Sequence, residues 1–89
     1  MLTREVEIIN KKGLHARAAS KLVQLATKFS SKIVLNRDGQ KSDGKSILGV
    51  LVLAAHMGSR ILISVEGDDE QAAMDALVDL IQRKFDEGE

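Results

Sequence analysis

Three stretches of the chain alternate between hydrophobic and polar residues, as strands do in a sheet with one buried face. The expected strands cover residues 2–9, 31–37 and 60–66. Their inward positions are Val6, Ile8, Ile33, Leu35, Ile61, Ile63 and Val65. The outward positions are largely polar, so the sheet is predicted to have helices on one face and water on the other.

Two further stretches repeat hydrophobic residues every three or four positions, which indicates amphipathic helices. The first runs from Ala16 to about residue 28, and the last is opened by Asp68 or Asp69. Their apolar stripes are Ala19, Leu22, Val23, Ala26 and Phe29 in the first helix, and Met74, Leu77, Val78, Ile81 and Phe85 in the last. The final residues, DEGE, are expected to form a solvated tail.

The middle of the chain predicts a hairpin followed by a short helix. Asp38-Gly39 is a strong signal for a two-residue turn, and the polar run 40–43 fits a short edge strand. Ser46 can cap a helix from Ile47 to about residue 55. The resulting order is βαββαβα, an α+β fold with one core, and residues 1–89 are expected to form a single domain.

This short helix is apolar almost all the way round, although a helix on a sheet buries only one side. Val50 and Leu53 are expected to face the core. The remaining apolar residues would then form an exposed strip of the kind that marks a partner surface: Ile47, Leu48, Leu51 and Val52. Deeper burial of the helix is the alternative. His56 follows and is expected to cap or solvate the helix end.

Composition excludes several classes of protein. Thirteen basic and thirteen acidic residues give zero net charge, and the only aromatic residues are two Phe, so nucleic-acid binding is not expected. Without Cys, and with two distant His, neither a metal site nor a cofactor is expected. Charges interrupt the first apolar run, which argues against a signal peptide, and no run is long enough for a membrane span. A soluble, cytoplasmic protein is expected.

The run GQKSDGKS, residues 39–46, matches the phosphate-loop pattern G-x-x-x-x-G-K-[ST]. Its first Gly, however, belongs to the expected hairpin turn and does not directly follow a buried parallel strand. A chain of 89 residues is also too short for a parallel sheet covered on both faces. A turn, a loop and a capping Ser46 are therefore favoured over a nucleotide site that uses Lys45.

The run KKGLHARAAS, residues 11–20, carries the candidate chemistry. His15 precedes the first helix and is a poor N-cap, so the first backbone N–H groups are expected to stay open. Arg17 adds a cation at the positive end of the helix, and Gly13 adds backbone freedom. Together, these groups fit an anion such as phosphate.

Both positive influences disfavour a charged imidazolium at His15. A neutral ring keeps a lone pair that can attack phosphorus near pH 7. No second residue nearby resembles a general base or a metal ligand, so the site is expected to accept and return a phosphoryl group. On spacing alone, an exposed His beside a solvated Arg is the more common explanation.

The runs GLHARAAS and KSILGVLVLAA together resemble the histidine-containing phosphocarrier (HPr) family of the phosphoenolpyruvate-dependent phosphotransferase system. The resemblance implies an open-faced β-sandwich, a four-stranded antiparallel sheet in the order 1-4-2-3 with three helices on one face. It implies that enzyme I phosphorylates His15 on Nδ1, that Arg17 steadies the phosphate, and that a IIA protein receives it. It also implies regulation by a kinase at Ser46, a partner surface that includes Ala16, and a monomeric carrier that is not an enzyme.

The chain departs from the family pattern in two places. Ala18 replaces a common Pro in the first turn of the helix, where Pro carries no chemistry. Leu48 and Leu51 stand where Met is usual, which makes the kinase role of Ser46 less secure than the role of His15. An interaction module without phosphotransfer stays the alternative, and the sequence does not distinguish sugar uptake from nitrogen regulation.

Overall fold

A computed structural model describes residues 1–87 and contains one four-stranded sheet. The strands are β1 (Leu2–Glu7), β2 (Lys32–Arg37), β3 (Gln40–Asp43) and β4 (Arg60–Glu66). They lie in the order β1-β4-β2-β3, and every neighbouring pair is antiparallel. The predicted strand order is therefore confirmed, with the polar strand β3 at an edge of the sheet.

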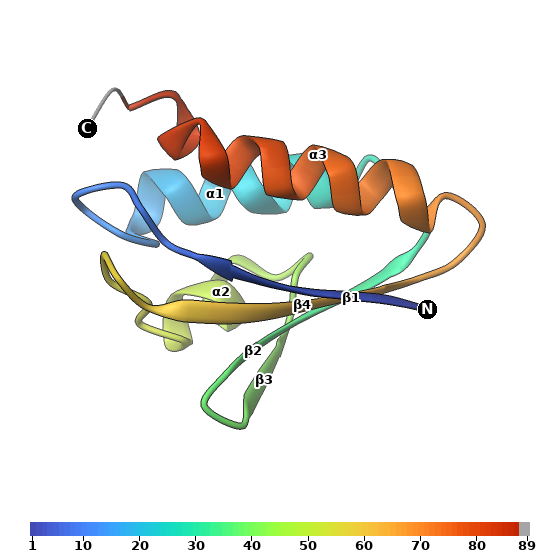
Figure 1. The fold of residues 1–89 in the computed structure, drawn as a ribbon, viewed down its shortest axis with the longest axis horizontal. Coiled ribbons are helices and arrows are strands. Elements are labelled where there is room, and N and C mark those ends of the chain that lie inside the picture. Colours follow the sequence, from blue (N-terminus) through green and yellow to red (C-terminus); the bar gives the residue numbers. More distant parts are fainter. Residues whose placement is uncertain (88–89) are drawn as a thin grey trace.

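Three α-helices and one short 3₁₀ helix accompany the sheet: α1 (Ala16–Ala26), α2 (Ile47–Val52), α3 (Glu70–Gln82) and η1 (Lys84–Asp86). Figure 1 shows α1 and α3 side by side on one face of the sheet. All three α-helices supply residues to the same core, which confirms the predicted α+β open-faced sandwich.

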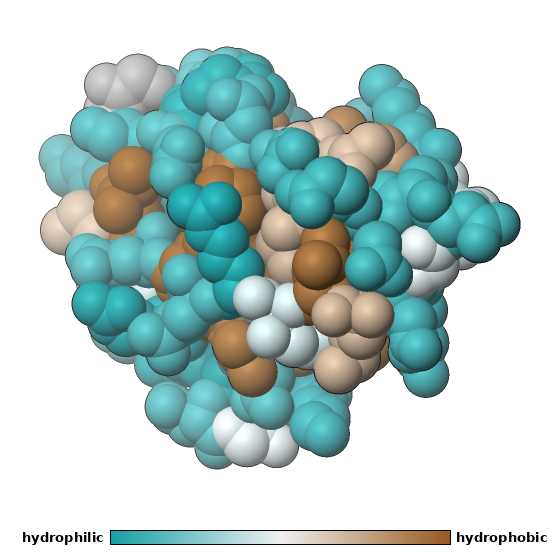
Figure 2. All heavy atoms as spheres, turned by 45° about the vertical axis from the view of Figure 1, so that its right-hand side comes forward, coloured by the Kyte–Doolittle hydropathy of each residue, from teal (hydrophilic) through white to brown (hydrophobic). Residues whose placement is uncertain are grey.

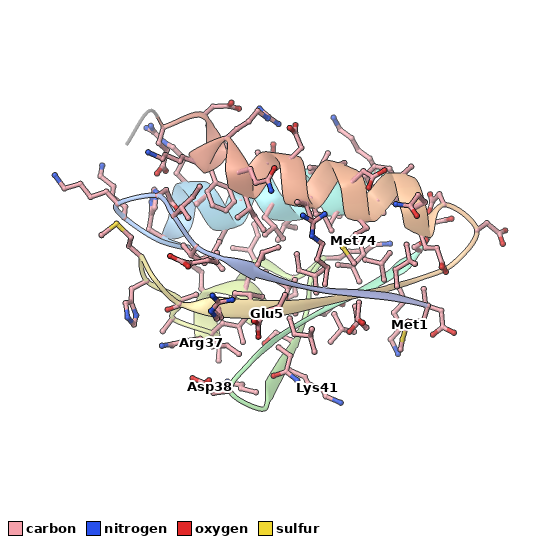
Figure 3. All side chains as sticks on the ribbon, viewed as in Figure 1. Met1, Glu5, Arg37, Asp38, Lys41 and Met74 are labelled. Atoms are coloured by element: carbon pink, nitrogen blue, oxygen red, sulfur yellow. The ribbon has the colours of Figure 1, made fainter. Side chains whose placement is uncertain are left out.

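The core follows the alternation read from the sequence. The inward residues of the strands are buried, as are most of the stripe residues of α1 and α3. Figure 3 shows Met74 between α3 and the sheet, whereas Asp38 and Lys41 lie on the hairpin that projects from the opposite side. None of the helices within residues 1–87 is long and apolar enough to cross a membrane. On the face drawn in Figure 2, hydrophobic residues form small patches between hydrophilic ones.

Helix α2 is shorter than predicted because the backbone turns left-handed directly after its C-cap, Leu53. Ala54 has φ +50°, which an α-helix cannot accommodate. The next residue, Ala55, is buried in an irregular segment. The segment 53–59 therefore forms a packed loop beside the start of α1.

A side chain at the start of α3 fixes the connection between α1 and β2. The Asp69 carboxylate accepts hydrogen bonds from the backbone N–H groups of Ser30 (2.9 Å) and Ser31 (3.0 Å) and from the Ser31 hydroxyl. Hydrogen bonds from the Ser31 hydroxyl and the Ser30 backbone hold the pKa of Asp69 below its ordinary value of 3.8. Asp69 opens the helix as predicted, but its side chain joins two distant segments and does not cap its own helix.

The C-terminal segment departs most from the prediction. Lys84, Phe85 and Asp86 have φ values of +56°, +54° and +61°, three consecutive left-handed residues without a glycine. Each costs about 1–2 kcal/mol for a residue with a side chain. Phe85 is fully buried, and its carbonyl accepts a hydrogen bond of 2.6 Å from Lys21 Nζ. Burial of this aromatic ring offsets the strain. The three left-handed residues themselves turn the chain after α3.

The expectation of a solvated DEGE tail is therefore wrong for Glu87. Its side chain is only 11% exposed, and it lies against the loop that precedes α1. Asp86 is exposed, as expected, and pairs with Arg83 at 2.6 Å. Gly88 and Glu89 lie outside the described residues.

Candidate functional site

The loop before α1 is held against the loop after α2. Leu14 N–H donates to the Ala55 carbonyl at 2.8 Å, and the Leu14 side chain is buried. Gly13 has φ +67°, and a Cβ there would lie 2.5 Å from the Ala55 oxygen. Only glycine fits this close approach of two backbones. The result is a fixed position for His15 at the start of α1, at the left of Figure 1.

His15 is the N-cap of α1 and caps it with backbone groups alone. Its carbonyl accepts from Ala19 N–H at 2.8 Å, and no side chain bonds to the first turn. The predicted open N–H groups at the helix start are therefore present within the described residues. Ala16 and Arg17 are exposed, and the Arg17 side chain forms no hydrogen bond or ion pair with any residue from 1 to 87.

A carboxylate lies directly against the His15 ring. Nε2 of His15 contacts Oε2 of Glu87, and the His15 side chain is 29% exposed. Oε1 of Glu87 accepts a hydrogen bond of 2.9 Å from Asn10 Nδ2. The same nitrogen of the fully buried Asn10 donates to the Gly13 carbonyl at 2.9 Å. Glu87 is thus held at both oxygens, which corrects the expectation that no second residue near His15 resembles a general base or a metal ligand.

Opposing influences act on the pKa of Glu87. Desolvation raises it, but hydrogen bonds from His15 and Asn10, together with the charge of Lys12, outweigh desolvation and leave the pKa below its ordinary value of 4.5. Glu87 is therefore ionised near pH 7 and can only accept hydrogen bonds. The only signal in the sequence for the contact between Glu87 and His15 is Phe85. A buried aromatic residue at this position also restricts where the residues directly after it can lie.

A hollow of about 170 Å³ opens at the same place. Its lining residues are Lys12, His15, Arg17, Lys21, Asp86 and Glu87. Three of the six are cations and two are carboxylates, and the open N–H groups of α1 lie beside them. The excess of positive groups fits an anion the size of a phosphoryl group. Within residues 1–87, no three His, Asp or Glu side chains are grouped so that they could hold a metal ion.

Ser46 caps α2 as predicted, with its Oγ accepting from Gly49 N–H at 3.1 Å. Val50 and Leu53 are buried, also as predicted. Ile47, Leu48 and Val52 are 44%, 76% and 58% exposed and form an apolar surface on α2. The fourth residue expected there, Leu51, is half-buried because it packs against the core.

Residues 39–46 do not have the geometry of a phosphate loop. Asp38 and Gly39 form the hairpin turn, with φ values of +52° and +91°, between antiparallel strands β2 and β3. Lys45 Nζ donates to the Phe29 carbonyl at 2.7 Å, near the end of α1. The adjacent hollow, about 500 Å³ between β2, β3 and Lys45, includes neither His15 nor Arg17. His56 is exposed with its ring near Ser59 Oγ, and its position suggests no chemistry.

Comparison with known proteins places a single family over nearly the whole chain. Residues 2–83 match the family model described as "PTS HPr component phosphorylation site". The phosphocarrier protein HPr of Cupriavidus necator is 54% identical over 89 residues, which is all of both chains. HPr of Xylella fastidiosa is 46% identical over 87 residues, 98% of each chain.

Solved structures of HPr proteins have the same fold as this chain. HPr from Thermoanaerobacter tengcongensis superposes with a TM-score of 0.95 at 49% identity and covers 98% of both chains. A structure of an HPr dimer from the same organism has a TM-score of 0.77 at 51% identity, covering 90% of this chain and 92% of that chain. Some relatives therefore form dimers.

Proposed function

The chain belongs to the HPr family of phosphocarrier proteins of the phosphotransferase system, and we propose that His15 is its phosphoryl acceptor. Phosphorylated enzyme I is the donor, and a IIA protein is the recipient. The observation that carries the proposal is the position of the His15 imidazole at an uncapped helix start beside Arg17. The His15 side chain is 29% exposed, so part of it stays accessible to an incoming partner.

The chemical step needs one lone pair and no metal ligand from this chain. His15 Nδ1 attacks the phosphorus, a nitrogen–phosphorus bond forms, and the bond from phosphorus to the donor breaks with its electron pair leaving on the donor. In the transfer to the IIA protein, a nucleophile of that protein attacks the phosphorus and forms a bond to it, and the nitrogen–phosphorus bond breaks with its electron pair returning to Nδ1 of His15. In each cycle the protein is the acceptor of one transfer and the donor of the next, so its role is that of a phosphoryl carrier rather than an enzyme.

Arg17 and the open N–H groups of α1 are the proposed phosphate ligands. Arg17 has no partner among residues 1–87 that it would have to give up, and its guanidinium can donate two parallel hydrogen bonds to phosphate oxygens. The N–H groups of the first turn point along the helix axis toward the same place. These donors meet the charge of the transferred group without a rearrangement of the fold.

The proposed partner surface combines Ala16 with the exposed face of α2, formed by Ile47, Leu48 and Val52, while Leu51 supports it from below. One face would then serve enzyme I and IIA proteins in turn, which favours a monomeric carrier. Ser46 lies at the edge of this face, where its hydroxyl is partly accessible to a kinase. A phosphate there would add about −1.5 to −2 charge.

A reconstituted relay tests the proposal. Enzyme I and phosphoenolpyruvate are mixed with a IIA protein, either from a sugar branch or from the nitrogen-regulatory branch, with and without this chain. We expect one IIA protein to become phosphorylated only when the chain is present, and His15→Ala to abolish the transfer. A relay that runs equally well with His15→Ala would contradict the assignment.

A further inference from the structure

Glu87 lies where it can determine which nitrogen of His15 carries the proton. Its Oε2 contacts Nε2 of the ring, while its Oε1 is held by Asn10. We propose that Glu87 is a positioning residue that keeps the proton of His15 on Nε2 and thereby leaves the lone pair of Nδ1 free for the phosphoryl group. This inference rests on the proposed role of His15 as acceptor.

The tautomer follows from counting protons. A neutral imidazole has one N–H and one lone pair, on opposite nitrogens. An ionised carboxylate cannot donate, so the contact with Nε2 is a hydrogen bond only if Nε2 carries the proton. The low pKa of Glu87, in which hydrogen bonds and nearby cations overcome desolvation, keeps the carboxylate ionised. Nδ1 is then the nucleophilic nitrogen.

Asn10 determines which way the group at position 87 faces. Its Nδ2 already donates to the Gly13 carbonyl, and its second N–H goes to Glu87 Oε1. Asn10 is fully buried, and a flipped amide would set its oxygen against two other oxygens. A side chain at position 87 that keeps the hydrogen bond with Asn10 must therefore offer it an oxygen.

The C-terminal turn places the Glu87 carboxylate beside His15. Phe85 is buried in the core, Lys21 Nζ holds its carbonyl at 2.6 Å, and three left-handed residues turn the chain back toward the start of α1. Strained backbone of this kind persists only where the surroundings stabilise it, and it is frequent at functional sites. Here the strained turn brings together the side chains of His15 and Glu87, which are 72 positions apart in the sequence.

The contact between Glu87 and Nε2 of His15 also stabilises the ring during phosphoryl transfer. As the nitrogen–phosphorus bond forms at Nδ1, positive charge develops on the ring, and the Nε2 proton remains in place. The Glu87 carboxylate offsets this charge through the hydrogen bond from Nε2. No proton has to be taken up or released for the phosphoryl group to arrive or leave, so the ring keeps one orientation throughout the cycle.

Glu87→Gln is the discriminating variant. Because Asn10 requires an oxygen, the new amide would turn its NH₂ toward Nε2 of His15 and would need a lone pair there. The ring would then shift its proton to Nδ1, the nitrogen that must attack. Glu87→Ala removes the acceptor without adding a donor and is expected to give an intermediate tautomer ratio.

The tautomer is measured directly by long-range proton–nitrogen NMR of the neutral ring in the unphosphorylated protein. Wild type is expected to show mainly the Nε2–H form, and Glu87→Gln to raise the Nδ1–H form from minor to major. Phosphoryl acceptance from enzyme I is expected to slow on the order of tenfold in the same variant. The matched control is Asp79→Asn, which removes one exposed charge and only a contact with Arg83.

The tautomer measurement tests the role of Glu87, and phosphoryl acceptance by wild type tests the proposed function, so the two can fail separately. An Nδ1–H ring in wild type, or an unchanged ring in a Glu87→Gln variant with a wild-type melting temperature, would overturn the role of Glu87. A melting curve and backbone amide spectrum for each variant exclude loss of the fold as the cause of a change. If wild type never accepts a phosphoryl group, the proposed function fails, whatever the tautomer measurement gives.

Discussion

At the scale of single residues, the candidate site depends on groups that are held in place by neighbours far away in the sequence. His15 is positioned by Gly13, which admits the Ala55 backbone, and by Glu87, which is itself held by Asn10. Arg17 is different, because it is exposed and its side chain forms no hydrogen bond or ion pair within the described residues. The fold thus holds His15, the proposed nucleophile, in place and leaves Arg17, the proposed phosphate ligand, without a side-chain partner that it would have to give up.

The role of Asp69 leads to a pH-dependent prediction. Hydrogen bonds from Ser31 and Ser30 hold its pKa below 3.8 in the folded protein, so its stabilising effect is complete above that value and is lost as the pH falls through the folded pKa. Asp69→Asn should therefore lower the melting temperature at pH 7, and the difference from wild type should shrink below about pH 3.8. Melting curves between pH 7 and pH 2 measure this.

Asp68→Asn is the matched control for that experiment, because Asp68 is exposed and its neighbour makes the contacts with Ser30 and Ser31. It should melt close to wild type at every pH. A difference for Asp69→Asn that stays constant down to pH 2 would contradict the linkage, because the lost interaction would then not depend on the ionised carboxylate.

At the scale of elements, the sequence predicted those parts whose local pattern and tertiary contacts agree. The alternation of Ile61, Ile63 and Val65 identified β4 with its observed bounds, and Asp38-Gly39 identified the hairpin. The end of α2 was placed too late because Ala54 adopts a left-handed conformation that its residue type does not indicate. Such a departure is decided by the packing of Ala55 and lies beyond local propensity.

The C-terminal turn could not be predicted for a similar reason. Left-handed backbone is normally indicated by Gly or Asn, and the run Lys84–Asp86 contains neither. Only the burial of Phe85 against the rest of the core makes this turn stable, and burial of that kind depends on the whole fold. For this reason the sequence indicated His15 and Arg17 as a site but did not indicate Glu87.

The N-terminus of α2 gives a prediction in which stability and function separate. A negative charge at a helix N-cap stabilises it by roughly 0.3–1 kcal/mol, so Ser46→Asp should keep the melting temperature of wild type or raise it slightly. The same charge lies at the edge of the surface formed by Ile47, Leu48 and Val52, where an unpaired charge in an interface can cost a few kcal/mol. Phosphoryl acceptance from enzyme I should slow by about tenfold or more.

Ser46→Asn is the control, because Asn has the shape of Asp, caps helices well and carries no charge. A thermal melt and a phosphotransfer time course on the same preparations measure both effects. An Asp variant that reacts as fast as the Asn variant would show that Ser46 lies outside the docking surface. An Asp variant that melts well below wild type would attribute the slower transfer to unfolding.

At the scale of the whole molecule, the loop before α1, the loop after α2 and the C-terminal turn meet at one end of the sandwich (Figure 1). The sheet keeps this end fixed by holding β1 and β4 as neighbours, since β1 ends at the loop before α1 and β4 begins directly after the loop that follows α2. A carrier that must meet two partners in turn benefits from one small, rigid, exposed site. This arrangement could be predicted from the sequence only as far as the order of its elements.

The central claim is that His15, and no other residue, accepts the phosphoryl group. Its most direct test is intact-protein mass spectrometry after incubation with enzyme I and phosphoenolpyruvate, comparing wild type with His15→Ala and with His56→Ala, which replaces the other histidine. Wild type and His56→Ala should each gain one phosphoryl mass that is lost in acid, as expected for phosphohistidine, and His15→Ala should gain none. Acid-labile phosphorylation of His15→Ala would contradict the account.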